Sequence, residues 1–300
     1  MDGYVLNKFV TLIKVGQRRF LIKHGQLSRT SFVLDFEADQ LARVALLDKL
    51  ITDGRIDADE LLGLQSDGGQ ANEVLELLLD EHVLVAPHSQ DFTQYYALIN
   101  ERRLSGEPIK PSIIVASSPE VEHALSDGLR GVDLPYTMVT PNEFFASEGT
   151  PESLVVVYDR FDSADFHRFN QFAIEHNTPL VLGYLDGSTT IIAPVVLHGE
   201  TVCYNELEIQ LEATLTHRPE YRAYKAVERA SMAYPPFLLN QLTFFSLHLW
   251  LDFVLTGSLK TKNRALIFDT ESLRFDLVDV LPLPVCPACR LDHAMSHDYL

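Results

Sequence analysis

The residues with the clearest chemical potential are two cysteines near the end of the chain. Cys286 and Cys289 form a Cys-x-x-Cys pair set between prolines in the segment Leu283–Arg290. Two thiols at this spacing on a tight turn can both bind one tetrahedral metal ion, at Zn–S distances of about 2.3 Å, and prolines stiffen such a turn. The one other cysteine, Cys203, lies far upstream. The pair therefore indicates either a metal clip that holds the tail to the body of the protein or two thiols in a loop without metal.

Composition restricts the class of protein. The chain has 300 residues, of which 46% are hydrophobic and 22% charged, and its net charge is −18. We therefore expect one to three globular domains and no broad basic surface for nucleic acid or an anionic membrane. Three cysteines fit a reducing compartment, and the N-terminal segment lacks the features of a signal peptide. The sequence predicts a cytoplasmic protein that binds neither nucleic acid nor a membrane.

The first ninety residues have the pattern of a small winged-helix domain, with a three-stranded meander, three helices and a short final strand. The segments are Lys8–Val15, Phe20–Lys23 and Thr30–Phe36, then Ala38–Ile51, Asp57–Leu62 and Ala71–Glu81, and finally His82–Val85. The third helix is acidic, whereas a helix that enters the major groove of DNA should be basic. An extended peptide could instead add beside the third strand and place its apolar side chains against the third helix. A purely structural role for this domain is the alternative.

The order and spacing of these elements over roughly Lys8–Ala86 resemble the PqqD-type peptide-recognition domain, which binds leader peptides of ribosomally made natural products. The resemblance implies that the third strand and the third helix bind a leader peptide. The candidate contacts, chosen by position, are Thr30, Phe32, Leu34, Val74, Leu77 and Leu78. The pattern does not separate residues that face the ligand from residues that face the core, because both surfaces favour apolar side chains.

The rest of the chain has the pattern of an α/β domain. A linker is predicted at residues 91–111, where an amphipathic stretch ends in Ser-Gly and is followed by Pro108 and Pro111. Over residues 112–300, strands that are apolar on both faces alternate with helices, which predicts a mainly parallel sheet. The expected fold class is thus α/β, with a winged-helix domain over residues 1–90 in front of it.

The loop after the first strand of this domain argues against a nucleotide site. A phosphate loop needs glycines so that the backbone can approach the phosphates at a helix N-terminus. Here the loop is Ala116-Ser117-Ser118-Pro119, without glycine or lysine, and proline also removes an amide donor. The serines are better interpreted as helix caps. We therefore predict no ATP site in this chain.

Two motifs point to a family for the second domain. A Gly-Glu-Thr-Val-Cys turn ends at Cys203, and the chain closes with Leu-Pro-Val-Cys-Pro-Ala-Cys ending at Cys289. Together with the α/β pattern over about Ser112–Arg290, these motifs resemble the ThiF-like, ubiquitin-activating-enzyme-like proteins of azole-modified microcin (TOMM) pathways. The PqqD-like domain in front of them agrees with that resemblance.

The resemblance also implies a structural zinc site. In that family two Cys-x-x-Cys pairs hold the metal. Here Cys286 and Cys289 form one intact pair, whereas the upstream pair has Cys203 and, three residues later, Glu206. The fourth ligand would be Glu206 or else His293, and loss of the metal is a third possibility. A closed four-ligand site has no open position for a substrate, so its role would be structural.

The combined resemblance implies a non-catalytic subunit of a bacterial cyclodehydratase complex. The N-terminal domain would hold a precursor leader, and the second domain would dock on a YcaO-type cyclodehydratase that forms thiazoline and oxazoline rings with ATP. A flavin-dependent azoline dehydrogenase is a further expected partner, and the apolar stretch Phe237–Val254 predicts a core helix or a homodimer interface. Two alternatives are a ThiF-like adenylating enzyme acting on a peptide and a winged-helix regulator with a ligand-binding domain.

Overall fold

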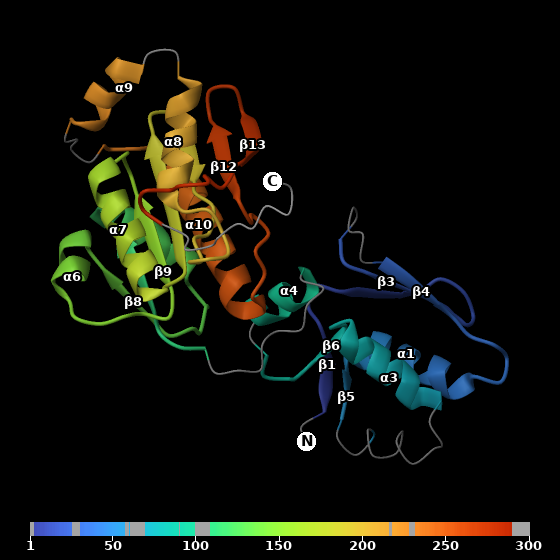
Figure 1. Cartoon of the computed structure of the whole chain (residues 1–300). Helices are drawn as coiled ribbons and strands as arrows, with labels where there is room; N and C mark the ends of the chain where they lie inside the picture. The colour runs from blue at the N-terminus through green and yellow to red at the C-terminus, as the bar shows by residue number, and fades with distance from the viewer. Residues whose placement is uncertain are drawn as a thin grey trace. The chain divides into compact units, whose positions relative to one another are not determined.

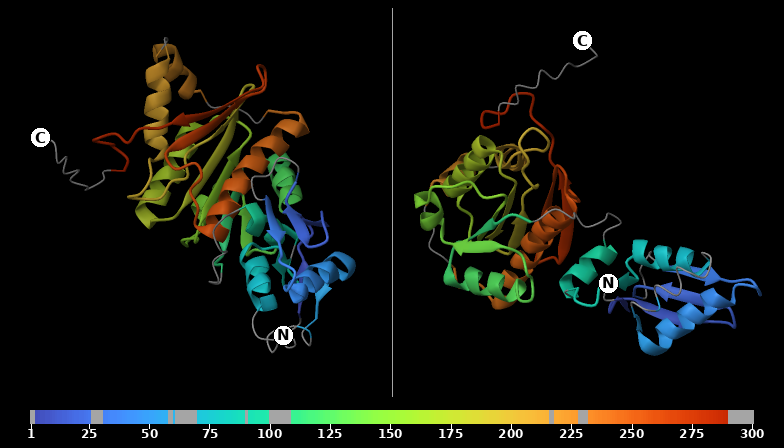
Figure 2. Two further views of the ribbon diagram at one scale, coloured as in Figure 1. Left: turned by 90° about the vertical axis from the view of Figure 1, so that its right-hand side faces the viewer. Right: turned by 90° about the horizontal axis from the view of Figure 1, so that it is seen from below.

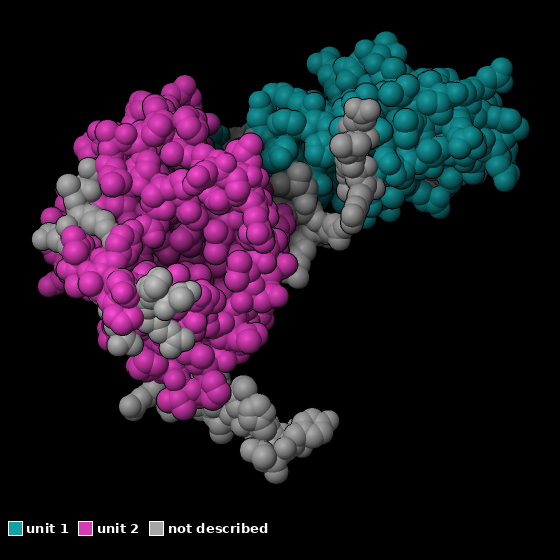
Figure 3. All heavy atoms as spheres, turned by 90° about the horizontal axis from the view of Figure 1, so that it is seen from above, with its two compact units in different colours: residues 1–104, 131–133 teal, residues 105–130, 134–300 magenta. Residues whose placement is uncertain are grey.

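The chain forms two compact units in the computed structural model. Unit 1 comprises residues 1–104 and 131–133, and unit 2 comprises residues 105–130 and 134–300 (Figure 3). The residues described are 3–25, 31–57, 60, 70–89, 91–99, 109–215, 218–227 and 232–289. Residues 91–99, which lie in the predicted linker, form a helix, α4 (Asp91–Ile99), within unit 1. Residues 100–108 lie outside the described part.

Unit 1 contains the predicted meander. Strands β2 (Thr11–Lys14), β3 (Arg19–Lys23) and β4 (Ser31–Asp35) form an antiparallel sheet in the order β2-β3-β4 (Figure 1). One face of this sheet packs into the core that also holds α1 (Leu41–Asp53) and α3 (Gln70–Asp80). The side chains on that face are Leu12, Phe20, Ile22, Phe32 and Leu34. The helix predicted at Asp57–Leu62 falls largely outside the described residues.

Unit 1 contains a second small sheet, of which the sequence predicted only the last strand. It consists of β5 (Arg55–Ile56), β1 (Tyr4–Leu6) and β6 (Leu84–Val85), in that order. Next to it the buried Asn7 side chain donates to the carbonyls of His82 (3.0 Å) and Gln94 (3.2 Å). These bonds join α4 to the rest of unit 1. They also satisfy the buried amide of Asn7, which would be costly to leave without partners.

Unit 2 is built on a seven-stranded sheet in the order β13-β12-β11-β10-β9-β7-β8. Strands β8, β7, β9 and β10 are parallel, and β11, β12 and β13 continue the sheet as an antiparallel meander. The bounds are β7 (Ser112–Ala116), β8 (Tyr136–Val139), β9 (Leu154–Tyr158), β10 (Leu180–Asp186), β11 (Thr189–Ile192), β12 (Arg264–Asp269) and β13 (Arg274–Asp279). The predicted α/β class is confirmed.

Helices cover both faces of this sheet (Figures 1 and 2). On one face lie α5 (Pro119–Gly128) and α10 (Pro236–Thr256), which pack against each other. Helix α10 also packs against β9, β10 and β11. On the other lie α7 (Ser163–His176) and α8 (Tyr204–Thr214). The shorter helices are α6 (Pro141–Ala146) and α9 (Arg218–Lys225). Because the central strands are covered twice, every residue of β9 is buried.

Helix α10 is a core helix of unit 2. Within the described residues it alone is long and apolar enough to cross a membrane, but its Trp250 is fully buried and donates from Nε1 to Ser153 Oγ at 3.0 Å. Gly183 on β10 permits the close packing, since a Cβ there would clash with Ser246 Oγ on α10. The helix ends at Gly257, whose φ of 64° is left-handed. The core helix predicted over Phe237–Val254 is therefore present.

Candidate metal centre and peptide-binding edge

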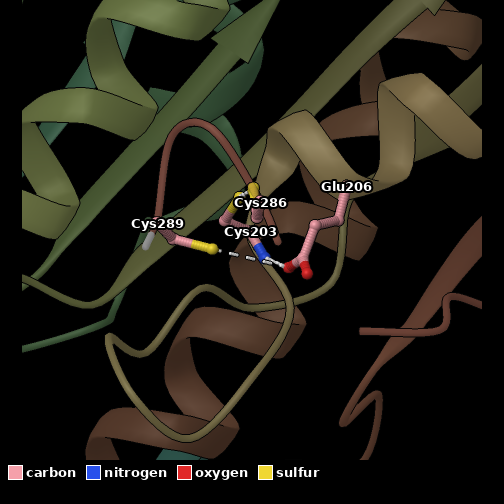
Figure 4. Close-up of side chains that lie close together, drawn as sticks. All are labelled: Cys203, Glu206, Cys286 and Cys289. Atoms are coloured by element: carbon pink, nitrogen blue, oxygen red, sulfur yellow. Dashed lines mark hydrogen bonds between the residues drawn. The ribbon is translucent and has the colours of Figure 1, made fainter. Parts of the chain in front are cut away.

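Three thiols and one carboxylate converge below the N-terminus of α8 (Figure 4). Cys203 precedes the first turn of α8 and Glu206 lies in that turn, while Cys286 and Cys289 lie on the tail after β13. One ligand atom from each residue lies within 4.8 Å of the others, and all four residues are buried. The structure thus brings together the four predicted ligands. His293, the alternative fourth ligand, lies outside the described residues.

The donor set fits a tetrahedral zinc ion. Zn–S bonds of about 2.3 Å and Zn–O bonds of about 2.0 Å place ligand atoms on neighbouring tetrahedral corners about 3.5–3.8 Å apart. The sulfurs of Cys203 and Cys286 are 3.6 Å apart, and Cys289 Sγ lies 3.7 Å from Glu206 Oε2. Asn205 also donates from Nδ2 to the sulfur of Cys286 at 3.4 Å, a bond that stabilises a thiolate in the way outer groups support metal ligands.

Glu206 also connects the tail to α8 directly. Its Oε2 accepts a hydrogen bond from the backbone N–H of Cys203 at 2.8 Å, and its Oε1 accepts one from the N–H of Leu283 at 2.7 Å. The first bond caps the helix, and the second joins positions 77 residues apart in sequence. Glu206 is fully buried, so its oxygens need hydrogen-bond partners. Both oxygens have one without a metal, and bonds to a carboxylate are charge-assisted.

Hydrogen bonds within the cluster shift the pKa values of two of its thiols in opposite directions. The hydrogen bond that Cys289 donates to Cys203 lowers the pKa of Cys203 to about 7, although burial acts in the opposite direction. The same bond, together with burial, raises the pKa of Cys289. One thiolate therefore forms readily at neutral pH, which favours metal binding because the thiolate is the ligand form of cysteine.

The loop after β7 is occupied by internal hydrogen bonds. Ser118 caps α5 by accepting from the N–H of Val121 at 3.4 Å, as expected from the sequence. The hydroxyl of Ser117 instead donates to Asp159 Oδ1 and accepts from the N–H of Asp159, both at 3.0 Å. The Ser117 bonds therefore link the loop after β7 to the residue that follows β9.

A second cluster, which the sequence did not reveal, surrounds the buried carboxylate of Glu208 on α8. Glu208 accepts hydrogen bonds from Ser163 Oγ at 2.6 Å and from His167 Nε2 at 2.7 Å, and Lys225 Nζ lies 3.3 Å away. Both the serine and the histidine bond the carboxylate rather than each other, so the histidine does not activate the serine as a nucleophile. The four side chains come from three helices, and single-sequence spacing gives no sign of their contact.

The Glu208 cluster should stabilise the protein above acidic pH. Burial raises the pKa of Glu208, but the bonds from His167 and Ser163 and the charges of His167 and Lys225 outweigh it and lower the pKa to about 2. A depressed carboxyl pKa gives stability that is present above the unfolded pKa, near 4.5, and is lost as the pH falls towards about 2. The shift corresponds to about 3 kcal/mol.

We therefore expect Glu208→Gln to reduce the free energy of unfolding at pH 7 by about 2–3 kcal/mol. The variant should also lose less stability than the natural chain between pH 5 and pH 2, as measured by urea unfolding at each pH. The exposed Glu175 on α7 provides a matched control, because Glu175→Gln removes one carboxylate without burial. Equal acid sensitivity of the Glu208 variant and the natural chain would contradict the assignment.

Some of the predicted peptide contacts of unit 1 lie in its core and others at its surface. Val74 and Leu78 are buried in the core, so their side chains are not available to a ligand without rearrangement. Phe32 and Leu34 are half-buried against the same core, and Leu77 is 37% exposed. Thr30 lies outside the described residues. Leu77 is thus the α3 candidate whose surface is open.

Strand β4 has an open edge. Within the described residues it pairs with β3 alone. In an antiparallel pair, hydrogen-bonded and non-hydrogen-bonded positions alternate. The bond from the Phe36 N–H to the Arg18 carbonyl (3.1 Å) shows which positions of β4 are hydrogen-bonded to β3. Phe32 and Leu34 therefore bond to β3, whereas Ser31, Val33 and Asp35 direct their N–H and C=O groups to the free edge. An unpaired edge of this kind is a template for an added strand.

Comparison with solved structures defines the fold. A heterocyclase in complex with substrate and cofactor matches 97% of this chain with a TM-score of 0.71 at 15% sequence identity, and the heterocyclase TruD matches 97% with 0.68 at 14%. MccB of E. coli matches 98% of the chain with 0.61 at 9% identity. Other MccB structures contain MccA, and one contains AMPCPP as well. The ThiF-like fold predicted from the sequence is thus confirmed.

The two heterocyclases are much longer than this chain, whereas MccB is not. The chain spans 40% and 43% of the two heterocyclase chains but 99% of MccB. No protein-family model and no curated protein matches the sequence. The comparisons therefore define the fold, while substrates and partners are matters for a proposal.

Proposed function

We propose that this protein is a leader-binding, non-catalytic subunit of a bacterial, cytoplasmic cyclodehydratase complex. Unit 1 binds the leader of a ribosomally made precursor peptide as an added strand on β4. The observation that carries this proposal is the open edge at Ser31, Val33 and Asp35, next to the half-buried Phe32 and Leu34. Main-chain bonds to the edge would supply affinity, and the side chains around it would supply specificity.

In this proposal the catalytic partner is a separate YcaO-type cyclodehydratase. The two heterocyclases share the fold of this chain over about two fifths of their length, which supports a role in heterocycle formation. The partner would use ATP to form the azoline rings, and a flavin-dependent dehydrogenase would oxidise them. Holding the leader raises the effective concentration of the core peptide at the partner's active site.

Reconstitution tests this division of labour. The YcaO-type protein and the precursor encoded beside this gene are incubated with ATP, with and without this chain, and ring formation is followed by mass spectrometry as loss of one water per ring. We expect at least about a hundredfold faster ring formation with the chain present, because tethering replaces a bimolecular encounter. Equal rates with and without the chain would refute the proposal.

An adenylating enzyme is the second candidate, because MccB matches over nearly its full length and has been solved with AMPCPP. The loop after β7 disfavours it, since Ser117 and Ser118 are engaged with Asp159 and α5 and the loop has no glycine. Calorimetry with MgATP distinguishes the two functions. Saturable ATP binding by the isolated chain would favour the enzyme.

We further infer that the cluster of Cys203, Glu206, Cys286 and Cys289 holds a structural zinc ion. Elemental analysis of protein purified without chelator should give about one zinc per chain, and Cys286→Ser should lower that ratio several-fold because thiolates dominate zinc affinity. A ratio near zero in the natural chain would rule out the metal. A homodimer through α10, where Phe237 and Phe244 are exposed, is a separate prediction for sedimentation analysis.

A further inference from the structure

The segment that contains the first strands of this acidic chain is basic. The whole chain has 42 acidic and 24 basic side chains, yet residues 3–34 contain six lysines and arginines and no acidic residue. They are Lys8, Lys14, Arg18, Arg19, Lys23 and Arg29. This segment includes β2, β3 and most of β4, so a positively charged sheet stands on a negatively charged protein.

The face of this sheet that points away from the core is apolar in the middle. Ile13, Leu21 and Val33 are direct neighbours across the three strands. Ile13 is 44% exposed, Val33 is 45% exposed and Leu21 is half-buried. Cross-strand aliphatic neighbours of this kind form a continuous ridge, and nothing in the described residues of unit 1 covers it.

Two cations on β3, Arg19 and Lys23, flank this aliphatic ridge on either side of Leu21. Arg19 is opposite Asp35 on β4, and their charged groups are 4.0 Å apart. Lys23 is opposite Ser31 and has no ion-pair partner among the described residues. Lys14 and Lys8, by contrast, pair with Asp48 and Asp91. Lys23 is therefore the cation next to β4 that has no ion-pair partner in the described part of unit 1.

The register of β4 determines what an added strand would meet on this outer face. Residues Ser31, Val33 and Asp35 point their side chains to the outer face and their backbone groups to the free edge. A strand placed about 4.8 Å beyond β4 puts its outward side chains directly beside these three. Because Ser31 is short, the extended Lys23 side chain can pass over it and reach a carboxylate on the added strand.

We propose that the peptide strand bound by β4 carries an acidic residue beside Ser31 and, two positions away on the same face, an aliphatic residue beside Val33. This inference rests on the proposed function and names the chemistry of the peptide. The acid would pair with Lys23, and the aliphatic side chain would extend the ridge of Ile13, Leu21 and Val33. A second acid beside Asp35 is disfavoured, since Asp35 already faces Arg19 and like charges repel.

Selection from a displayed library of random short peptides tests the inference on the full-length chain. The natural chain should enrich peptides with an acidic and an aliphatic residue two positions apart. Lys23→Glu should enrich lysine or arginine at the acidic position and keep the aliphatic one. Lys110→Glu provides a matched control, because it makes the same charge change at an exposed position in unit 2 and should leave the selected pattern unchanged.

A fluorescein-labelled copy of the best peptide then gives the size of the effect. Its Kd should rise about five- to tenfold for Lys23→Glu, because an exposed ion pair is weak and its reversal adds repulsion. Replacing the acid of the peptide by lysine should restore binding to that variant. If both forms of the protein selected the same sequences, the charge inference would fall while peptide binding stood. If no form selected any peptide, the proposed function itself would fall.

Discussion

Replacing Glu206 by alanine is expected to lower the free energy of unfolding by about 3–5 kcal/mol and to release the tail that carries Cys286 and Cys289. The carboxylate is fully buried and accepts the N–H groups of Cys203 and Leu283. Without it two backbone donors are left unsatisfied in the interior, each at a cost of about 1–3 kcal/mol, and a cavity replaces the side chain. Urea unfolding measures the loss of stability, and a chromogenic thiol reagent measures the exposure of the cysteines.

Two further substitutions at this position separate hydrogen bonding from metal binding. Glu206→Gln keeps the size of the side chain but offers one acceptor to two N–H groups, so we expect an intermediate loss of stability. Glu206→Cys supplies a fourth thiolate, so it should be markedly more stable with zinc than after chelation. An alanine variant as stable as the natural chain, with cysteines equally protected, would contradict the role of Glu206 in holding the tail.

Substitution of Val33 by proline is expected to weaken leader binding by about thirtyfold or more while leaving unit 1 folded. The N–H of Val33 points to the open edge of β4, so proline there removes no bond to β3, and edge strands tolerate proline at such positions. An added strand, however, would lose one main-chain bond, leave its own carbonyl unsatisfied and meet the proline ring. Fluorescence anisotropy with the labelled leader measures the change.

The design includes controls for folding and for the side chain. Val33→Thr has nearly the same shape and retains the N–H, so it should bind within a fewfold of the natural chain. Leu34→Pro removes a bond to β3 and should destabilise unit 1, which circular dichroism would show. Unchanged binding by a folded Val33→Pro variant would show that the leader does not add to β4.

Much of the fold could be predicted from the sequence because its apolar patterns are strong. The strands apolar on both faces indicated a mainly parallel sheet covered on both sides, as β9 shows, and the apolar stretch Phe237–Val254 indicated α10. The short strands β1 and β5 could not be predicted, since three- and two-residue strands carry no periodicity. Their pairing depends on contacts between distant parts of unit 1.

The candidate metal centre could be predicted as a set of residues but not as a network. The resemblance to a family with two Cys-x-x-Cys pairs implied that Cys203 and Glu206 would join Cys286 and Cys289. The bond from Glu206 to the N–H of Leu283 depends on the path of the tail, which no local pattern encodes. The Glu208 cluster could not be predicted for the same reason, because its members come from three different helices.

The peptide contacts of α3 illustrate the limit of apolar patterning. Val74 and Leu78 are four residues apart and share the face that packs into the core, whereas Leu77 lies toward the edge of that face. Leucine and valine are compatible with both a core-facing and a ligand-facing position, so the sequence does not distinguish the two. Only the position of α3 against the sheet assigns each side chain to the core or to the surface.

Isothermal titration of the full-length chain with the leader peptide of the precursor encoded beside its gene tests the central claim most directly. The account predicts saturable binding of one leader per chain, with a Kd of about 1 μM or tighter, that does not require ATP. Binding should weaken as salt is added, because the open β4 edge lies on a basic sheet. Absence of saturable binding by the folded, full-length protein would contradict the account.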